Sequence, residues 1–199
     1  MQGSNTPLRL HLGCGTPTPA GWVDVDRAPD ARLAKLGPLA GWSRTLGLSR
    51  RLPWRDGSVA AVYCAHTLDH LGRREGEFFL FECARVLAPG GVARVVVTDL
   101  SALLADYEKG AFPSAEFVER LGVLPDRPGD GWLARRLAPL LRSPRRCLYD
   151  AEGLLDAMYS VGLEARIHAP GLSRLEDIGS LERGDEEGLL IVEGVKGDV

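Results

Sequence analysis

The sequence predicts an α/β fold in which helices cover both faces of a mostly parallel, doubly wound sheet. Three observations lead to this prediction. Short apolar segments bounded by turn residues recur along the chain, segments of helical periodicity separate several of them, and two of the apolar segments have almost no polar positions. Strands that alternate with helices favour a parallel sheet, and a nearly continuous apolar run is typical of a strand covered on both faces.

The predicted strands are residues 8–12, 22–26, 59–64, 92–97, 163–168 and 189–195. Residues 74–88 predict a helix, because apolar side chains recur there at helical spacing and the sequence Pro89-Gly90-Gly91 stops it. Asp150 can cap a second helix over residues 151–161. A long acidic loop joins the last two strands, which we expect to form an antiparallel edge. Residues 33–51 give no clear strand.

Composition places bounds on the class of protein. The chain has 199 residues, is 45% hydrophobic and carries a net charge of -3. We expect one domain over residues 1–199, with a helical cap inserted at about 101–147. A protein that binds nucleic-acid phosphates usually has a basic surplus, so no nucleic-acid partner is expected. The four cysteines form no CxxC pair and predict reduced thiols, not a metal site. Without a signal-peptide pattern or an apolar span, we expect a cytoplasmic protein that does not bind membranes.

A glycine-rich segment, Leu12-Gly13-Cys14-Gly15-Thr16, directly follows the first predicted strand. Glycines let the backbone turn sharply and bring its N–H groups close to a ligand. The next strand ends in Asp26, whose carboxylate can accept hydrogen bonds from both hydroxyls of a ribose. Ligands of parallel sheets bind at the carboxyl ends of the strands, so these features predict a site for a nucleoside-containing cofactor. The alternative is that the glycines only form a tight turn.

The spacing of this segment favours a cofactor without phosphates. The dinucleotide fingerprint has a third glycine where this chain has Thr18, and it needs a full helix whose N-terminus meets a pyrophosphate. Only nine residues separate Leu12 from Trp22, and Pro17 and Pro19 interrupt them, so that at most one helical turn fits. S-adenosylmethionine satisfies these conditions and NAD does not.

Four segments, LHLGCGTPTPAGWVDVD, LPWRDGS, VYCAHTLDHL and FECARVLAPGGVARVVVTDL, occur in an order and spacing that resemble the class I S-adenosylmethionine-dependent methyltransferases. The most similar type is the methyltransferase type 11-like group, with its HLGCG, HVLEHL and RVLKPGG motifs. The tail from Leu148 to Lys196 is similar to the last helix and terminal strands of that group. The resemblance implies a Rossmann-like fold, a methyltransferase activity and S-adenosylmethionine as cofactor.

The resemblance also implies roles for individual residues. Gly13, Cys14 and Gly15 would pass beneath the methionine portion of the cofactor, with Thr16 in the same cofactor-binding loop. Asp26 would hold the ribose, and Ala65 and His66 would close over the cofactor. The chain departs from related sequences at two positions that often carry an acid, where it has Leu48-Ser49 and Ala60.

The segment His66-Thr67-Leu68-Asp69-His70 places two histidines four positions apart on one helix face. It resembles a shortened zinc-protease motif, but it follows a buried strand and lacks a third ligand, so no metal site is expected. Methyl transfer needs a general base only when the acceptor must lose a proton. His66 or His70, oriented by Asp69, could act as that base, and His66 and Asp69 are the catalytic candidates. The alternative is that the histidines only begin a helix.

Residues 131–147 form an arginine-rich segment whose leucines share one face while its arginines lie outside it. An ordinary amphipathic element with solvated arginines accounts for this pattern. A second interpretation is a lid whose arginines, Arg145 and Arg146 among them, attract an anionic acceptor such as a phosphorylated sugar.

These observations lead to two hypotheses about function. The first is a methyltransferase that acts on a small-molecule or carbohydrate-like acceptor. The second is a methyltransferase-like binding module that holds little or no cofactor and catalyses nothing, which the departures at Leu48-Ser49 and Ala60 suggest. The element that is methylated and the oligomeric state do not follow from the sequence.

Overall fold

The computed structural model describes residues 7–13, 20–26, 44–45, 51–123, 144–176, 178–182 and 188–198. At residues 26, 44, 45 and 180 it describes the backbone alone. The statements below concern these residues.

Seven strands form one sheet in the order β3-β2-β1-β4-β5-β7-β6. The strands are β1 (Arg9–Leu12), β2 (Trp22–Asp26), β3 (Arg44–Thr45), β4 (Val59–Ala65), β5 (Leu87–Thr98), β6 (Leu163–Ile167) and β7 (Leu189–Lys196). Every neighbouring pair is parallel except the two that involve β7, which runs antiparallel to both β5 and β6. The predicted mostly parallel sheet with an antiparallel edge is therefore confirmed.

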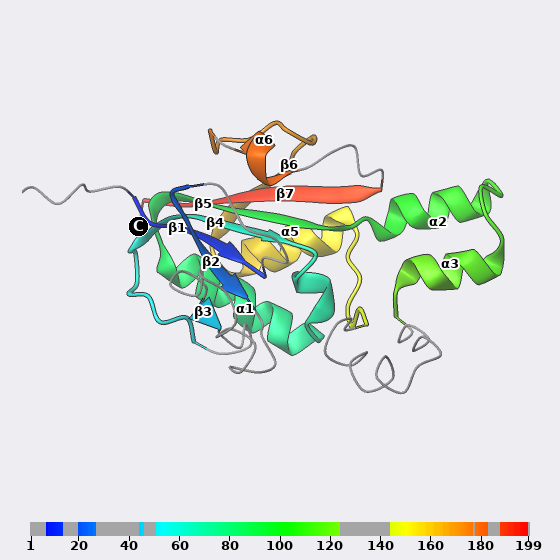
Figure 1. Ribbon diagram of the computed structural model, residues 1–199, viewed down its shortest axis with the longest axis horizontal. Helices are drawn as coiled ribbons and strands as arrows, with labels where there is room; N and C mark the ends of the chain where they lie inside the picture. Colours follow the sequence, from blue (N-terminus) through cyan, green and yellow to red (C-terminus); the bar gives the residue numbers. More distant parts are fainter. Residues whose placement is uncertain are drawn as a thin grey trace, which may run out of the picture.

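The main core lies on the sheet face that is covered by α1 (Arg73–Val86) and α5 (Ala151–Ser160) (Figure 1). Leu10 and Leu12 of β1 point into this core and are fully buried. The opposite face carries a smaller apolar cluster, in which Trp22 and Tyr63 lie with Ile178 of the short helix α6 (Ile178–Leu181). Helices thus lie on both faces, as expected for a doubly wound sheet.

The helix boundaries follow local sequence signals. Helix α1 ends at Val86, two residues before the predicted end, and Pro89-Gly90-Gly91 lies within β5, which begins at Leu87 and is longer than the predicted strand 92–97. The Asp150 side chain accepts a hydrogen bond of 2.8 Å from the Gly153 N–H, which confirms the predicted cap of α5. Strand β3 was not predicted, because its two residues are too few to give a periodic pattern.

Helices α2 (Leu100–Glu108) and α3 (Ser114–Leu121) follow β5 and extend away from one end of the sheet (Figure 1). Stacked rings of Tyr107, Phe112 and Phe117 hold the two helices together. Both helices fall within the range predicted for the cap, whose assignment as an insertion in a single domain stays a prediction. No helix among the described residues is long and apolar enough to cross a membrane.

Candidate functional site

The carboxyl ends of β1, β2 and β4 lie level with one another. Leu12 of β1 is paired with Val25 of β2, and His11 is paired with Tyr63 of β4. Continued by one or two residues, this register brings Gly13 opposite Asp26 on one side and Ala65 on the other. The Gly13 N–H donates a hydrogen bond of 2.7 Å to the Val25 carbonyl and so keeps the end of β1 on β2. Three predicted site residues, distant in sequence, are therefore neighbours at one edge of the sheet.

Gly13 has no room for a side chain. Its φ of +78° lies in the left-handed region, and a Cβ atom placed on it would lie 1.9 Å from Thr67 Oγ1 and 2.9 Å from Thr67 Cβ. The Thr67 hydroxyl is itself held by the Ala65 carbonyl at 3.1 Å and the Leu12 carbonyl at 3.3 Å. The loop after β4 therefore packs directly on the backbone at the end of β1, and only glycine permits that approach.

His66 also has a left-handed backbone, with a φ of +49°, and it is the one non-glycine residue with positive φ among those described. Its N–H donates a hydrogen bond of 2.9 Å to the Val96 carbonyl of β5, which fixes the loop against the neighbouring strand. A side-chain-bearing residue in this conformation costs about 1–2 kcal/mol, and such residues cluster at functional sites. The fold thus supports a strained histidine directly at the carboxyl end of β4.

Asp69 lies in the short helix η2 (Leu68–His70) and its side chain is 1% exposed. Its Oδ2 accepts a hydrogen bond of 2.9 Å from Arg145 Nε, while its Oδ1 is buried and has no hydrogen-bond partner within the described part of the chain. The cation that Asp69 contacts is thus an arginine, and not the histidine that the sequence analysis expected it to orient.

Arg145 connects this loop to α3. Its Nη1 donates hydrogen bonds to the carbonyls of Arg120 at 2.7 Å and Leu121 at 3.4 Å, and its N–H donates one of 2.8 Å to the Gly122 carbonyl. A cation is favourable at the C-terminus of a helix, where carbonyl groups lack partners. One side chain therefore neutralises Asp69 and caps α3.

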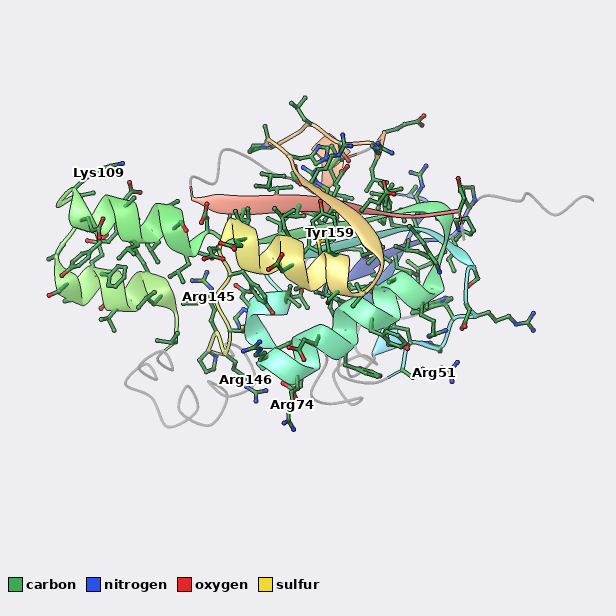
Figure 2. The ribbon with its side chains drawn as sticks, turned by 180° about the vertical axis from the view of Figure 1, so that it is seen from behind. Arg51, Arg74, Lys109, Arg145, Arg146 and Tyr159 are labelled. Carbon is green, nitrogen blue, oxygen red and sulfur yellow. The ribbon has the colours of Figure 1, made fainter. Side chains whose placement is uncertain are left out.

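Arg146 and His70 complete the contacts between residues 144–147 and the loop after β4. Arg146 Nη1 donates a hydrogen bond of 2.5 Å to Glu75 Oε2 at the start of α1. The His70 ring nitrogen Nδ1 lies 3.3 Å from the Pro144 carbonyl. Figure 2 shows Arg145 and Arg146 on the segment that leads into α5, beside the start of α1. Both arginines form ion pairs with this chain's own carboxylates, Arg145 with the buried Asp69 and Arg146 with the partly exposed Glu75, so an anion would have to compete with these carboxylates; the anion-attracting lid stays a prediction.

His11, which is buried, and Asp24, which is partly exposed, form a polar pair on the adjacent strands β1 and β2. His11 Nδ1 lies 3.6 Å from Asp24 Oδ1, and the imidazole ring lies against the Tyr63 ring with centroids 5.1 Å apart. Burial lowers the pKa of His11, although Asp24 opposes that shift. Asp24 thus has a partner on the neighbouring strand β1.

Several predicted positions lie outside the described residues. These are Cys14, Gly15 and Thr16 of the cofactor loop, Leu48-Ser49, and residues 131–143 of the arginine-rich segment. Among the described residues, no group of three or more His, Cys, Asp or Glu side chains could hold a metal ion.

Sequence analysis missed two residues that shape the site. Thr67 is the side chain that leaves no room for a Cβ atom at Gly13. The available signal was that both residues closely follow predicted strands of a mostly parallel sheet. Arg145 was expected to be either a solvated arginine or part of an anion-attracting lid, because no local pattern reveals a partner 76 positions away.

Residues 10–95 match the family model of a methyltransferase domain. Solved structures share the fold over nearly the whole chain. One is an S-adenosylmethionine-dependent methyltransferase from Thermotoga maritima, with 20% identity, 94% of this chain and 81% of that chain covered, and a TM-score of 0.53. Another is an S-adenosylmethionine-dependent methyltransferase from Methanosarcina mazei, with 17% identity, 96% and 92% covered, and a TM-score of 0.56. No curated protein matches the sequence significantly.

A third similar structure is DhpI, which was solved in complex with S-adenosylmethionine and HEP. It is 17% identical, with 97% of this chain and 80% of that chain covered, and a TM-score of 0.56. The match over residues 10–95 includes β1, β2, β4 and the loop after β4, which are the elements of the candidate site. The comparisons confirm the predicted fold class.

Proposed function

We propose that this chain, a class I S-adenosylmethionine-dependent methyltransferase, transfers the methyl group of its cofactor to a small-molecule or carbohydrate-like acceptor. One observation carries the proposal for the site. The strand register makes Gly13, Asp26 and Ala65 neighbours, next to a left-handed His66. A close backbone approach and a carboxylate at the end of the next strand are the features that an adenosine-containing ligand needs.

The proposed cofactor contacts divide between three strand ends. The loop that begins at Gly13 and continues through Cys14, Gly15 and Thr16 lies beneath the methionine portion. Asp26 accepts hydrogen bonds from the ribose hydroxyls, and Ala65 and His66 border the cofactor from the end of β4. This donor set suits a phosphate-free nucleoside, because β2 begins only nine residues after β1 and leaves no room for a long helix whose N-terminus would bind phosphates.

S-adenosylmethionine supplies an electrophilic methyl group on a sulfonium. For such a displacement the chain has mainly to align the acceptor and exclude water. If the acceptor is a hydroxyl, the imidazole of His66 can accept its proton, since imidazole titrates near neutral pH. We propose that Asp69 acts on the site through Arg145, by holding the loop that carries His66, because its carboxylate contacts that arginine.

A small anionic or sugar-linked acceptor was inferred from the arginine-rich segment, where an anion would have to compete with this chain's own carboxylates for Arg145 and Arg146. We further propose a reducing compartment, the cytoplasm, since Cys64, Cys83 and Cys147 are free thiols.

Titration calorimetry with S-adenosylhomocysteine, and with NAD as a control ligand, tests the cofactor site. We expect micromolar binding of the first alone. Asp26→Ala should weaken it by about 10- to 100-fold, because two hydrogen bonds to a charged group are lost. Asp24→Asn is the matched control, since Asp24 lies two residues earlier on the same strand and pairs with His11.

Normal affinity in the Asp26→Ala variant would refute the assigned ribose contact. Failure of the wild-type chain to bind either ligand would favour the binding module. Given binding, transfer of a radiolabelled methyl group to a panel of phosphorylated and neutral sugars tests the acceptor class. Loss of transfer in His66→Gln, with unchanged S-adenosylhomocysteine affinity, is the result expected if His66 acts as the base.

A further inference from the structure

The outer edge of β6 is an unpaired strand edge among the strands that the structure describes, where β6 pairs with β7 alone. Two contacts establish which backbone groups face outward. The His168 N–H, directly after β6, donates to the Ile191 carbonyl of β7 at 2.9 Å, so the even-numbered residues face β7. The Ala165 carbonyl instead accepts a hydrogen bond of 2.7 Å from the Tyr159 hydroxyl of α5. The N–H and C=O groups of Leu163, Ala165 and Ile167 therefore face away from the sheet.

The five residues of β6, Leu-Glu-Ala-Arg-Ile, are complementary to themselves when two copies run antiparallel. With Ala165 at the centre, Glu164 lies opposite Arg166 of the partner subunit, and Leu163 opposite Ile167 of the partner subunit. A centre at Glu164 or at Arg166 would instead place two like charges opposite each other, which is unfavourable. The register about Ala165 is thus the one that pairs all five residues of both strands and places opposite charges across the axis, and in it the outward-facing residues form the hydrogen-bonded pairs.

Both charged side chains are available for such pairing. Glu164 and Arg166 are exposed, and neither takes part in an ion pair within the described part of the chain. Their side chains share one face of β6, so opposite charges across a two-fold axis would meet twice.

Two apolar side chains also remain exposed along this edge. Ile167 is 53% exposed and Tyr159, which Figure 2 labels on α5, is 54% exposed. Antiparallel pairing covers Ile167 with the far end of the second strand and brings the two Tyr159 rings toward the two-fold axis. The Tyr159 hydroxyl does not block the pairing, because a carbonyl oxygen has two lone pairs and can accept a second hydrogen bond.

We propose that the chain forms a symmetric homodimer in which β6 pairs antiparallel with β6 of a second copy about Ala165. The two sheets then become continuous. The interface is small, so we expect a dissociation constant in about the micromolar range. The site at the ends of β1, β2 and β4 lies toward the opposite side of the sheet order and stays open. The proposal is independent of the proposed function.

Sedimentation equilibrium of the full chain, from low to several hundred micromolar, tests the proposal. Glu164→Arg and Arg166→Glu each place two like-charge pairs across the axis, and each should weaken dimerisation by about 10- to 30-fold. The double variant with both changes restores the opposite-charge pairs and should restore the dimer. Arg74→Glu, an exposed reversal on α1, is the matched control and should leave the dimer unchanged.

Three outcomes would overturn the proposal: a wild-type chain that stays monomeric throughout the range, a dimer that neither single reversal weakens, and a double variant that stays dissociated. Far-ultraviolet circular dichroism and S-adenosylhomocysteine titration of each variant show that it is folded. Recovery in the double variant excludes misfolding as the cause of the single-variant losses.

Discussion

Replacing Gly13 with alanine should destabilise the fold by about 3–6 kcal/mol, because three costs add there. The left-handed backbone, with φ at +78°, costs a side-chain-bearing residue about 1–2 kcal/mol. The new Cβ would lie 1.9 Å from Thr67 Oγ1, so Thr67 has to move, and losing the hydrogen bonds of its hydroxyl costs about 1 kcal/mol. Displacing a packed loop adds about 1–3 kcal/mol.

Urea unfolding measures this loss, with Gly110→Ala as the matched control. Gly110 has nearly the same φ, +75°, but no atom lies within 4 Å of a Cβ placed there. The control should therefore lose only the backbone term of about 1–2 kcal/mol. Adding Thr67→Ala to the Gly13 variant removes the hydroxyl overlap and leaves the 2.9 Å contact with Thr67 Cβ, so it should recover part of the stability. Equal losses in the two single glycine variants would refute the argument from Thr67.

Two further predictions concern charged residues. Arg145→Gln leaves Asp69 buried without a cation and should lower the free energy of unfolding in urea by about 3–5 kcal/mol. Arg146→Gln breaks an exposed ion pair and should lower it by at most about 1 kcal/mol. Similar losses in the two variants would contradict this difference. Arg85 donates two hydrogen bonds to Glu82 and lowers the pKa of that carboxyl below its ordinary value of 4.5. The stabilising effect of the ionised Glu82 is present above that value and is lost as pH falls through the lowered pKa. Acidification should therefore lower the free energy of unfolding of the wild type more than that of Glu82→Gln. Parallel dependence of the two unfolding free energies on pH would disprove this.

The regular elements were predictable because local sequence determines them. Residues Val92 to Val97 are apolar enough to predict a strand, and Pro89-Gly90-Gly91 places the end of α1 to within a few residues, because proline and glycine disfavour a helix. The level strand ends that assemble the candidate site then follow from parallel topology, since ligands of such sheets bind at carboxyl ends. The position of Gly13 beside Asp26 could thus be expected from two motifs and their order.

Polar residues inside the strands could not be interpreted in this way. Arg94 is fully buried in a strand that composition marks as apolar, and it donates a hydrogen bond of 2.8 Å to Glu193, 99 positions later. Glu182 receives two more bonds from the same guanidinium. The Arg94–Glu193 pair arises from the register between β5 and β7. The periodicity of a single segment does not reveal which residues of two strands lie opposite each other.

The HTLDH segment shows why a motif needs its surroundings before its residues receive roles. Histidine, aspartate and histidine at short spacing suggest a base oriented by a carboxylate, yet the Asp69 carboxylate accepts its hydrogen bond from Arg145. The Asp69 carbonyl also accepts hydrogen bonds from the N–H groups of Arg146, at 2.7 Å, and Cys147, at 3.1 Å. Asp69 and Arg145 thus join residues 145–147 and the end of α3 to the loop after β4, which carries His66. The contacts of the Asp69 carboxylate therefore indicate a residue that holds this loop in place through an ion pair.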